Sequence, residues 1–243
     1  MPILEWLPER SRAQIEAAVA AVERSLGDGL IGVCLIGPAA RPDSDSRAQP
    51  ELLIVADELG PETLRTLARA LVGPLQAGLQ IRTVTDTELR GSVDVHALEL
   101  AQWRDLNQLL AGRDPFAELD IAAVDLRHEI ERALRTLGHR LRNRLLWCLA
   151  TEQQRLDALL RESLERLVAL AQQSLQLLGE PVPDDDEAVL EAFLRWAGAE
   201  LDGVARLRAR LSGEQPAGDP VAELAALAAA TEAATAAVDS LMV

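Results

Sequence analysis

The stretch 30–55, LIGVCLIGPAARPDSDSRAQPELLIV, decides the fold of the first half of the chain. Two apolar runs, 30–36 and 52–55, flank a polar loop rich in Pro, Asp, Ser and Arg. Short apolar runs separated by turn-forming residues are typical of β-strands joined by a loop. The stretch therefore predicts one strand, a loop that starts at Gly37, and a second strand that begins with the carboxylate of Glu51.

The residues around this strand pair predict a small α/β domain. Apolar residues at spacings of three and four indicate helices over 8–26 and 60–76, which glycines can terminate. Alternating apolar residues indicate a third strand over 79–84. We expect a fourth strand over 93–100, although 98–110 also has helical spacing.

From Val124 onward the pattern changes to long amphipathic segments. We expect helices over 124–150, 152–178, 185–211 and 220–241, separated by Gly- and Pro-containing breaks. Acids at 184–186 and Asp219 before a proline are favourable at helix N-termini, where backbone amides lack partners. Short connections between long apolar-faced helices favour an antiparallel bundle.

The strand, glycine, polar loop and strand at 30–55 resemble the nucleotidyltransferase superfamily. In that family the loop runs from Gly-Ser or Gly-Gly to Asp-x-Asp; the glycine turn holds the phosphates of a nucleoside triphosphate and the acids hold a divalent metal. Here Pro38 follows Gly37, and Gln49-Pro50-Glu51 takes the place of Asp-x-Asp. The resemblance implies the fold together with a degenerate metal site.

A Gly-Arg-Asp-Pro-Phe turn at 112–116, followed by a Leu- and Arg-rich helix, resembles a group of bacterial proteins with an N-terminal nucleotidyltransferase-like domain. Kanamycin-type nucleotidyltransferases are similar in layout. We therefore predict an α+β chain. An N-terminal nucleotidyltransferase-like α/β domain, residues 1–116, precedes an all-α antiparallel four-helix bundle, residues 117–243.

Nucleotidyl transfer needs carboxylates that converge on magnesium, which neutralises the triphosphate and activates a hydroxyl. The resemblance places Glu51 at the second family acid and Gln49 at the first, where an amide brings no charge. Glu99 could supply a third acid from a neighbouring strand, and Asp45 could supply one from the loop. Glu51 and Glu99 are the candidate catalytic residues, and with Asp45 they are the candidate metal ligands. The alternative for each is an ordinary strand-end or loop acid.

Five residues form a basic stripe on the predicted helix 124–150. At about 100° per residue, spacings of four, three, four and three place them on one face. The candidate nucleotide- or phosphate-binding residues are Gly37 and four members of the stripe, Arg132, Arg135, His139 and Arg142. The alternative for the stripe is a solvated helix face with internal ion pairs. The stripe consists of His128, Arg132, Arg135, His139 and Arg142.

Composition limits the classes of partner. The formal charge of −15 argues against general nucleic-acid binding, and all 24 basic residues are Arg, so lysine chemistry is excluded. Cys34 and Cys148 have no metal-ligand spacing and are expected to be buried thiols. We expect no signal sequence and no membrane span, and therefore a cytoplasmic protein.

Three functions remain open from the sequence. The first is a degenerate nucleotidyltransferase-like protein, catalytically impaired, that binds a nucleotide triphosphate, a phosphate or a protein partner. The second is an active magnesium-dependent enzyme that adenylylates a small molecule or a protein hydroxyl. The third is a helical-bundle interaction module that dimerises or binds a partner; Arg132 and His139 loosely resemble the Arg and His of HEPN ribonucleases.

Overall fold

The computed structural model describes residues 4–42, 49–150, 156–213 and 219–242. Its internal contacts divide the chain into two units, Met1–Ala122 and Ala123–Val243. Phe116 and Leu119 pack in the core of the first unit, so the segment after Phe116 belongs to that unit. Each unit is described by itself below.

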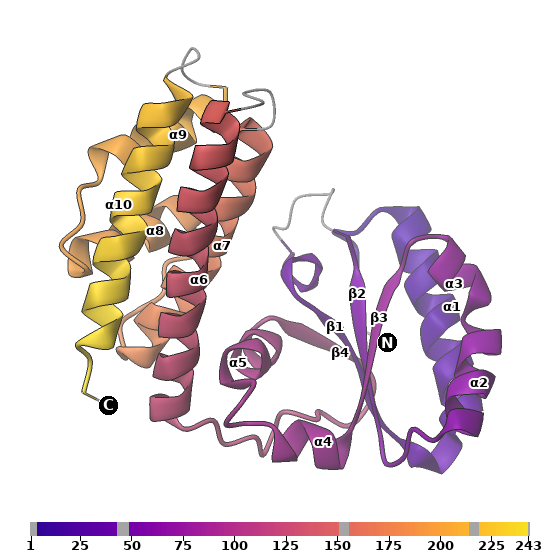
Figure 1. The fold of residues 1–243 in the computed structure, drawn as a ribbon. Coiled ribbons are helices and arrows are strands. Elements are labelled where there is room, and N and C mark those ends of the chain that lie inside the picture. The colour runs from indigo at the N-terminus through magenta and orange to yellow at the C-terminus, as the bar shows by residue number, and fades with distance from the viewer. Residues whose placement is uncertain (1–3, 43–48, 151–155, 214–218, 243) are drawn as a thin grey trace. The chain divides into compact units, whose positions relative to one another are not determined.

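The first unit is built on a mixed sheet of four described strands in the order β3-β2-β1-β4 (Figure 1). They are β1 (Leu30–Ile36), β2 (Glu51–Ala56), β3 (Gln80–Thr85) and β4 (Asn107–Gly112). Strand β1 pairs antiparallel with β2 and β4, and β2 pairs parallel with β3. The nearly continuous apolar sequences of β1 and β2 fit this central position, because both faces of these strands are buried.

Helices cover both faces of the sheet (Figure 1). On one face, α1 (Glu9–Leu26) and Leu67 of α2 (Pro61–Ala70) pack in one core with alternate residues of β1 and β2 such as Leu35 and Ile54. Helix α3 (Val72–Gln76) contacts α1 and α2. On the other face lie α4 (Asp86–Gly91) and α5 (Ala97–Asp105), whose Leu89 and Leu100 contact the residues of opposite parity, among them Leu53. The period of two in each strand therefore separates two cores.

The expected strand over 93–100 is wrong. This segment leads into α5, whose buried residues Ala97, Leu98, Leu100 and Ala101 follow helical rather than alternating spacing. The fourth strand lies further along the chain, at Asn107–Gly112. Glu99 is consequently a helix residue and not the strand residue that the sequence predicted.

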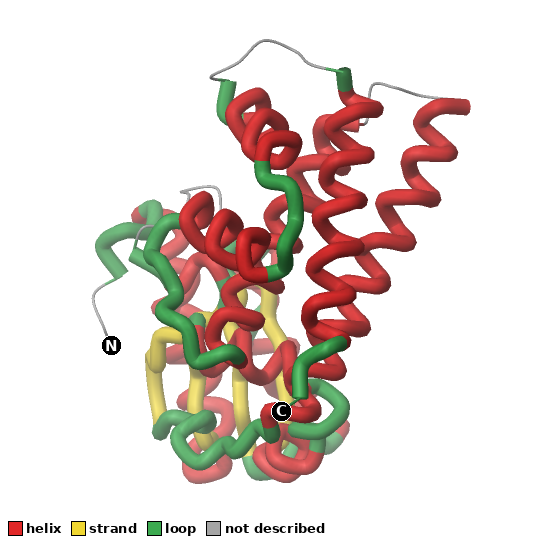
Figure 2. The backbone as a smooth tube through the Cα atoms, turned by 90° about the vertical axis from the view of Figure 1, so that its left-hand side faces the viewer, coloured by secondary structure: helices red, strands yellow, loops and turns green. Residues whose placement is uncertain are grey.

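The second unit consists of five described helices (Figure 2). They are α6 (Ala123–Ala150), α7 (Leu156–Leu177), α8 (Asp186–Trp196), α9 (Asp202–Leu211) and α10 (Pro220–Asp239). The single helix expected over 185–211 is two helices, because Gly198, with φ of 68°, ends α8 in a left-handed conformation. The predicted caps are confirmed: the side chains of Asp185 and Asp219 accept hydrogen bonds from the N–H groups of Ala188 and Val221, each at 3.0 Å.

Helix α10 is rich in alanine and packs against α6, α7, α8 and α9. Gly138 of α6 lies against Thr231 of α10, so small residues let these two helices approach closely. By length and composition alone, the span Val221–Asp239 is apolar enough to cross a membrane, and 44% of the qualifying window is buried within the protein. This helix corrects the expectation that no segment reaches the length and hydropathy of a membrane span.

Candidate functional site

The candidate site lies on the face of the sheet that α4 and α5 cover. Glu51 is the first residue of β2, and Arg82 lies in the middle of the neighbouring parallel strand β3, opposite Leu53. Because side chains alternate along a strand, Glu51, Leu53 and Arg82 project from the same face of the sheet. Leu53 lies next to both charged residues on this face and is fully buried in the core with Leu89 and Leu100.

Arg82 joins the two acids that the sequence selected as catalytic candidates. Its Nε donates a short hydrogen bond to Oε1 of Glu51, and its Nη1 donates one of 3.0 Å to Oε1 of Glu99. The guanidinium carbon lies 5.5 Å from the centroid of the Trp103 ring. We call Glu51, Arg82, Glu99 and Trp103 the Arg82 cluster.

The Arg82 cluster is partly exposed to solvent. The exposed fractions of the side chains are 49% for Arg82, 23% for Glu51 and 39% for Glu99. The hydrogen bond to Glu51, with the charges of Glu51 and Glu99, holds the pKa of Arg82 above its ordinary value despite some desolvation. Arg82 is therefore a permanent cation between two carboxylates, in a position that solvent screens only in part.

An open pocket of about 720 Å³ adjoins the Arg82 cluster. Arg82, Glu99 and Trp103 line it together with His96 and Glu88. The carboxylate of Glu88 is already used at the start of α4, where it accepts 2.9 Å hydrogen bonds from the N–H and the hydroxyl of Thr85. These bonds lower the pKa of Glu88. The pocket thus combines an aromatic ring with charged groups that already have partners.

The other predicted metal ligands do not complete a metal site in the described part of the chain. Asp45 lies outside the described residues. The Gln49 amide faces the turn before β3: its Nε2 donates to the carbonyl of Gly78 at 2.6 Å, and its Oε1 accepts from Gln80 at 3.2 Å. Within the described ranges, no three His, Cys, Asp or Glu side chains gather as metal ligands would. Glu51 and Glu99 are both hydrogen-bonded to the guanidinium of Arg82, and two carboxylates held by a cation in this way do not fit a magnesium ion.

The turn after β1 uses its backbone amides within the protein. Gly37 has a φ of 72°, which glycine adopts without strain, and its N–H donates to the carbonyl of Leu106 at 2.9 Å. Pro38 has no N–H, and the N–H groups of Ala40 and Arg41 close the turn on the carbonyls of Gly37 and Pro38. The turn thus holds α5 and β4 next to β1, and these amides do not point outward together, as a phosphate would require.

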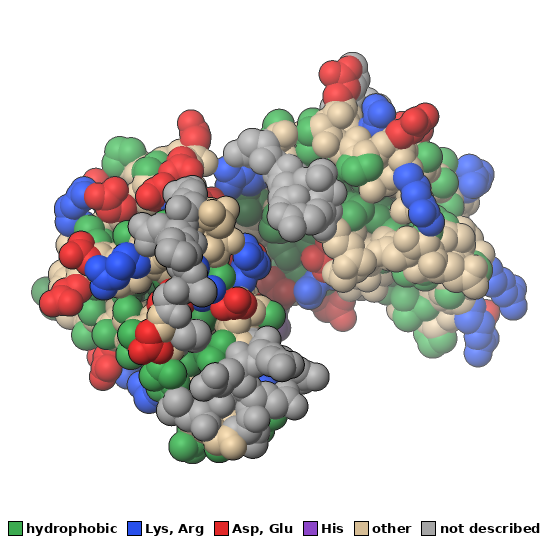
Figure 3. All heavy atoms as spheres, turned by 90° about the horizontal axis from the view of Figure 1, so that it is seen from above, with side chains coloured by type: hydrophobic (Ala, Val, Ile, Leu, Met, Phe, Trp, Pro, Cys, Tyr) green, Lys and Arg blue, Asp and Glu red, His purple; other side chains and the backbone are tan. Residues whose placement is uncertain are grey.

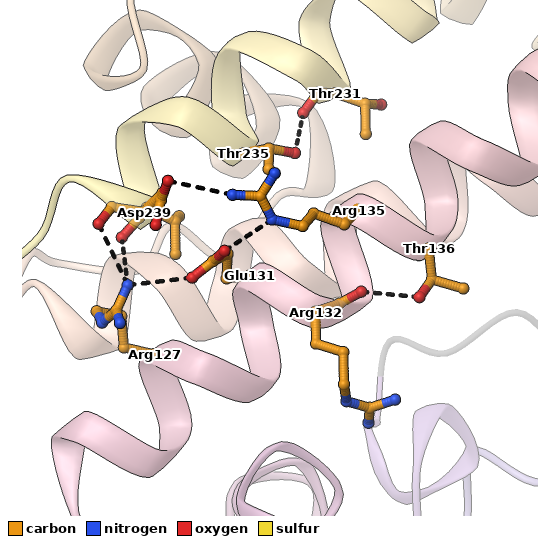
Figure 4. Close-up of polar contacts among 9 residues, drawn as sticks. Arg127, Glu131, Arg132, Arg135, Thr136, Thr231, Thr235 and Asp239 are labelled. Carbon is orange, nitrogen blue, oxygen red and sulfur yellow. Dashed lines mark hydrogen bonds and ion pairs between the residues drawn. The ribbon is translucent and has the colours of Figure 1, made fainter.

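The basic stripe lies exposed on α6. Two of its arginines are in ion pairs, and Figure 4 shows those of Arg135. Arg132 binds Glu129 of the same helix through Nε and Nη2, at 2.7 and 2.8 Å. Arg135 binds Glu131 at 2.7 Å and also Asp239, near the end of α10, at 3.1 Å. The hydrogen bond from Arg135 is the main cause of the lowered pKa of Glu131.

The remaining stripe residues, His128, His139 and Arg142, are exposed, and no ion pair joins them to another described residue. Acidic and arginine side chains are interspersed over the face of the molecule seen in Figure 3. The stripe is therefore less strongly basic than its sequence suggests, because carboxylates from α6 and α10 neutralise two of its five members.

Sequence reasoning missed Arg82 and Trp103. A signal for Arg82 was present, because it is a charged residue at the centre of the short strand QIRTVT. The signal for Trp103 was its spacing of four from Glu99, which became meaningful only once this segment was known to be helical.

The comparisons with known proteins bear on the fold. No protein-family model matches the chain, and no curated protein matches it. Among solved structures, the chain is similar to spectinomycin adenyltransferase AAD(9) from Enterococcus faecialis, crystallised with ATP and spectinomycin. The TM-score is 0.57 at 13% sequence identity, and the match covers 91% of this chain and 99% of the other. The chain therefore has a nucleotidyltransferase-like fold, an N-terminal α/β unit followed by a helical unit.

Proposed function

We propose that this protein is a nucleotidyltransferase-like protein that does not catalyse magnesium-dependent nucleotidyl transfer and acts instead as a binding protein for a nucleotide or a protein partner. One observation carries the proposal: the guanidinium of Arg82 is hydrogen-bonded to both Glu51 and Glu99. Nucleotidyl transfer requires such carboxylates to hold a metal ion that neutralises the triphosphate. Arg82 takes the place that this chemistry needs for the metal.

The turn after β1 supports the same proposal. A phosphate-binding turn directs several free N–H groups at the phosphate oxygens. In this chain Pro38 has no N–H, and the N–H of Gly37 is bonded to Leu106. At the position expected for the metal, the guanidinium of Arg82 binds the two glutamates, and at the position expected for the phosphate, the N–H of Gly37 binds the carbonyl of Leu106. Both groups make contacts within the protein.

The test is a calorimetric titration of the purified chain with ATP and with GTP, each in magnesium and in EDTA, combined with an assay for AMP transfer. We expect no transfer, and we expect the heat of any nucleotide binding to be the same in magnesium and in EDTA. The Glu51→Gln variant serves as the matched control and should behave as the wild type does. Magnesium-dependent transfer that Glu51→Gln abolishes would refute the proposal.

The rival proposal is an active enzyme that adenylylates a hydroxyl group of a small molecule or a protein. Two observations favour it: Glu51 and Glu99 converge, and the similar structure is an adenyltransferase crystallised with ATP and spectinomycin. The transfer assay therefore includes spectinomycin as an acceptor. Transfer to this acceptor, lost in Glu99→Gln, would establish the rival.

Exposed apolar residues at the end of α6 support a third role, in which the helical unit binds a protein partner. Leu146 and Trp147 have exposed fractions of 72% and 38%, and the guanidinium of Arg144 lies 5.8 Å from the Trp147 ring centroid. An exposed apolar pair beside arginines is typical of an interaction surface. If this surface forms a homodimer, sedimentation velocity will show a dimer that Leu146→Glu dissociates, whereas a monomer at high concentration would exclude the dimer.

A further inference from the structure

We propose that the open pocket beside the Arg82 cluster binds an organic cation: an alkylammonium or alkylguanidinium group, carried either by a free amine or by a lysine or arginine side chain of a protein partner. The inference goes beyond the proposed function, because it assigns a class of ligand to this pocket, whether or not a nucleotide binds elsewhere on the chain. Three features of the pocket carry it: an apolar inner lining, an aromatic ring and an excess of carboxylates.

The inner lining of the pocket is apolar. Leu53, Leu89 and Leu100 line it and belong to the core on this face of the sheet, where each is at most 2% exposed. The volume of about 720 Å³ is that of a site for a small organic molecule. Such a lining stabilises the aliphatic chain of a ligand, as it does the stem of a lysine or arginine, whereas a phosphate group gains nothing from it.

The polar side of the pocket already holds an organic cation that belongs to the protein. The guanidinium carbon of Arg82 lies 5.5 Å from the centroid of the Trp103 ring, and its Nη1 donates to Oε1 of Glu99 at 3.0 Å. An aromatic ring and a carboxylate are the groups that attract ammonium and guanidinium ions. In the described part of the chain only Oε1 of Glu99 has a hydrogen-bond partner, so its Oε2 remains available to a ligand.

Carboxylates outnumber cations around the pocket. Glu88 and Glu99 line it, and Glu51 lies beside it in the Arg82 cluster. Arg82 is the only arginine among the described residues that line the pocket, and it is hydrogen-bonded to two of these acids. An anion entering the pocket therefore meets net negative charge, whereas an ammonium or guanidinium group is attracted. The formal charge of −15 on the whole chain favours the approach of cations in the same way.

The test follows the indole N–H signals of the full ¹⁵N-labelled chain by two-dimensional NMR at pH 8. The chain has four tryptophans, and the Trp103→Phe variant identifies the signal of Trp103. The probes share one butyl chain and differ in the head group: butylguanidinium, butylammonium, butanol and butyrate. We expect both cations to shift the Trp103 signal saturably, with an affinity roughly tenfold or more above that of butyrate, and butanol to lie between them. ATP in EDTA should leave this signal in place.

Glu99→Gln tests the charge of the pocket, because it removes one carboxylate and keeps the shape of the side chain. It should lower the affinity for butylguanidinium several-fold and narrow the margin over butyrate, whereas a purely structural role of Glu99 would change all four probes alike. Glu62→Gln is the matched control. Glu62 is an exposed acid of the same unit that pairs with Arg65 on α2 and does not line the pocket, so this variant changes the net charge equally and should bind as the wild type does.

A blocked peptide with one arginine between glycines distinguishes the two sources of the cation. If the peptide shifts the Trp103 signal as butylguanidinium does, the ligand is a side chain of a protein partner, and if only the small cations do so, it is a free amine. The inference is overturned if the wild type shows no saturable shift with the cations, or if butyrate or ATP binds beside Trp103 as tightly as they do. These titrations do not depend on AMP transfer, and transfer by the wild type would refute the proposed function alone.

Discussion

Gly112→Ala should destabilise the first unit strongly, because this glycine lies where β4 meets β1. Gly112 pairs with Gly32 across the two strands and has a φ of 76°. A Cβ at position 112 would lie 2.3 Å from the carbonyl oxygen of Ile31 and 2.9 Å from Cα of Gly32. Both are backbone atoms of a central strand, so they cannot move aside as the end of a flexible side chain could.

The expected cost has two parts. A left-handed conformation costs a residue with a Cβ about 1–2 kcal/mol. Moving the strands apart weakens the 2.8 Å hydrogen bond from the N–H of Arg113 to the carbonyl of Ile31, at about 0.5–1.5 kcal/mol. The lower entropy of the unfolded chain with alanine returns about 0.4–1 kcal/mol. The free energy of unfolding should therefore fall by about 2 kcal/mol.

Differential scanning calorimetry of the full chain, supported by urea unfolding, measures this change. For a unit of this size a loss of about 2 kcal/mol lowers the midpoint by about 6–10 °C. The matched control is Gly91→Ala at the end of α4, where an added Cβ meets no atom within 4 Å and φ is not in the left-handed region. It should be neutral or slightly stabilising. A Gly112→Ala protein as stable as Gly91→Ala would refute the reasoning.

Three further predictions concern buried or paired groups. Burial raises the pKa of the Cys34 thiol to about 12, so in a Cys148→Ser background Ellman's reagent should react slowly with the folded protein at pH 8. Fast labelling would contradict the burial of Cys34. Because the thiol ionises at a lower pH in the unfolded chain than in the folded protein, the free energy of unfolding should also fall as the pH rises from about 8.5 to 12. Arg135→Gln removes the ion pairs with Glu131 of α6 and Asp239 of α10, and should lower the melting temperature of the helical unit at pH 7. Because Arg135 lowers the pKa of Glu131, the difference in melting temperature from the wild type should disappear as the pH falls below about 4. A difference that does not depend on pH would contradict the ion pairs. Glu223→Gln removes the charge of a carboxylate that pairs with Arg210 where both side chains are only 10% exposed, while Arg210 keeps its pair with Asp157 at 2.8 Å. We expect a cost of about 1–2 kcal/mol in urea unfolding, and a change below about 0.5 kcal/mol would contradict a contribution of this pair to stability.

The fold could be predicted from the sequence where one local pattern decides the structure. The two apolar runs became β1 and β2, Gly37 ends β1, and Asp185 and Asp219 cap α8 and α10. In each of these places hydrophobic periodicity, turn residues and capping residues favour the same structure. The nucleotidyltransferase-like fold was implied by the resemblance of this strand, glycine, loop and strand to that superfamily.

Prediction failed where tertiary contacts decide between two local patterns. The segment 93–100 has alternating apolar residues, but burial of Leu100 against the sheet favours helix α5. The helix expected over 185–211 is interrupted where Gly198 ends α8, a break that helical spacing alone does not reveal. Local periodicity cannot rank such alternatives, because the free energy that decides them comes from partners distant in the sequence.

The candidate site was predicted in part for the same reason. Glu51 and Glu99 could be selected because family acids and spacing are local features, and the structure brings them together. Their shared partner Arg82 could not be selected, because its position between them depends on the parallel register of β2 and β3 and on the helical state of α5. Whether the two glutamates act on a metal stays a prediction that the nucleotide titrations in magnesium and in EDTA test.

The position of Arg82 on β3 also matters for the behaviour of the sheet in concentrated solution. Strand β3 is one end of the described sheet, with β2 on its inner side. Such an end strand can recruit a strand from another molecule, and a charge at its centre opposes this pairing because it must lose water when the sheet extends. A neutral residue at position 82 would therefore leave QIRTVT as an uncharged strand rich in β-branched residues, the kind of segment from which protein aggregation starts.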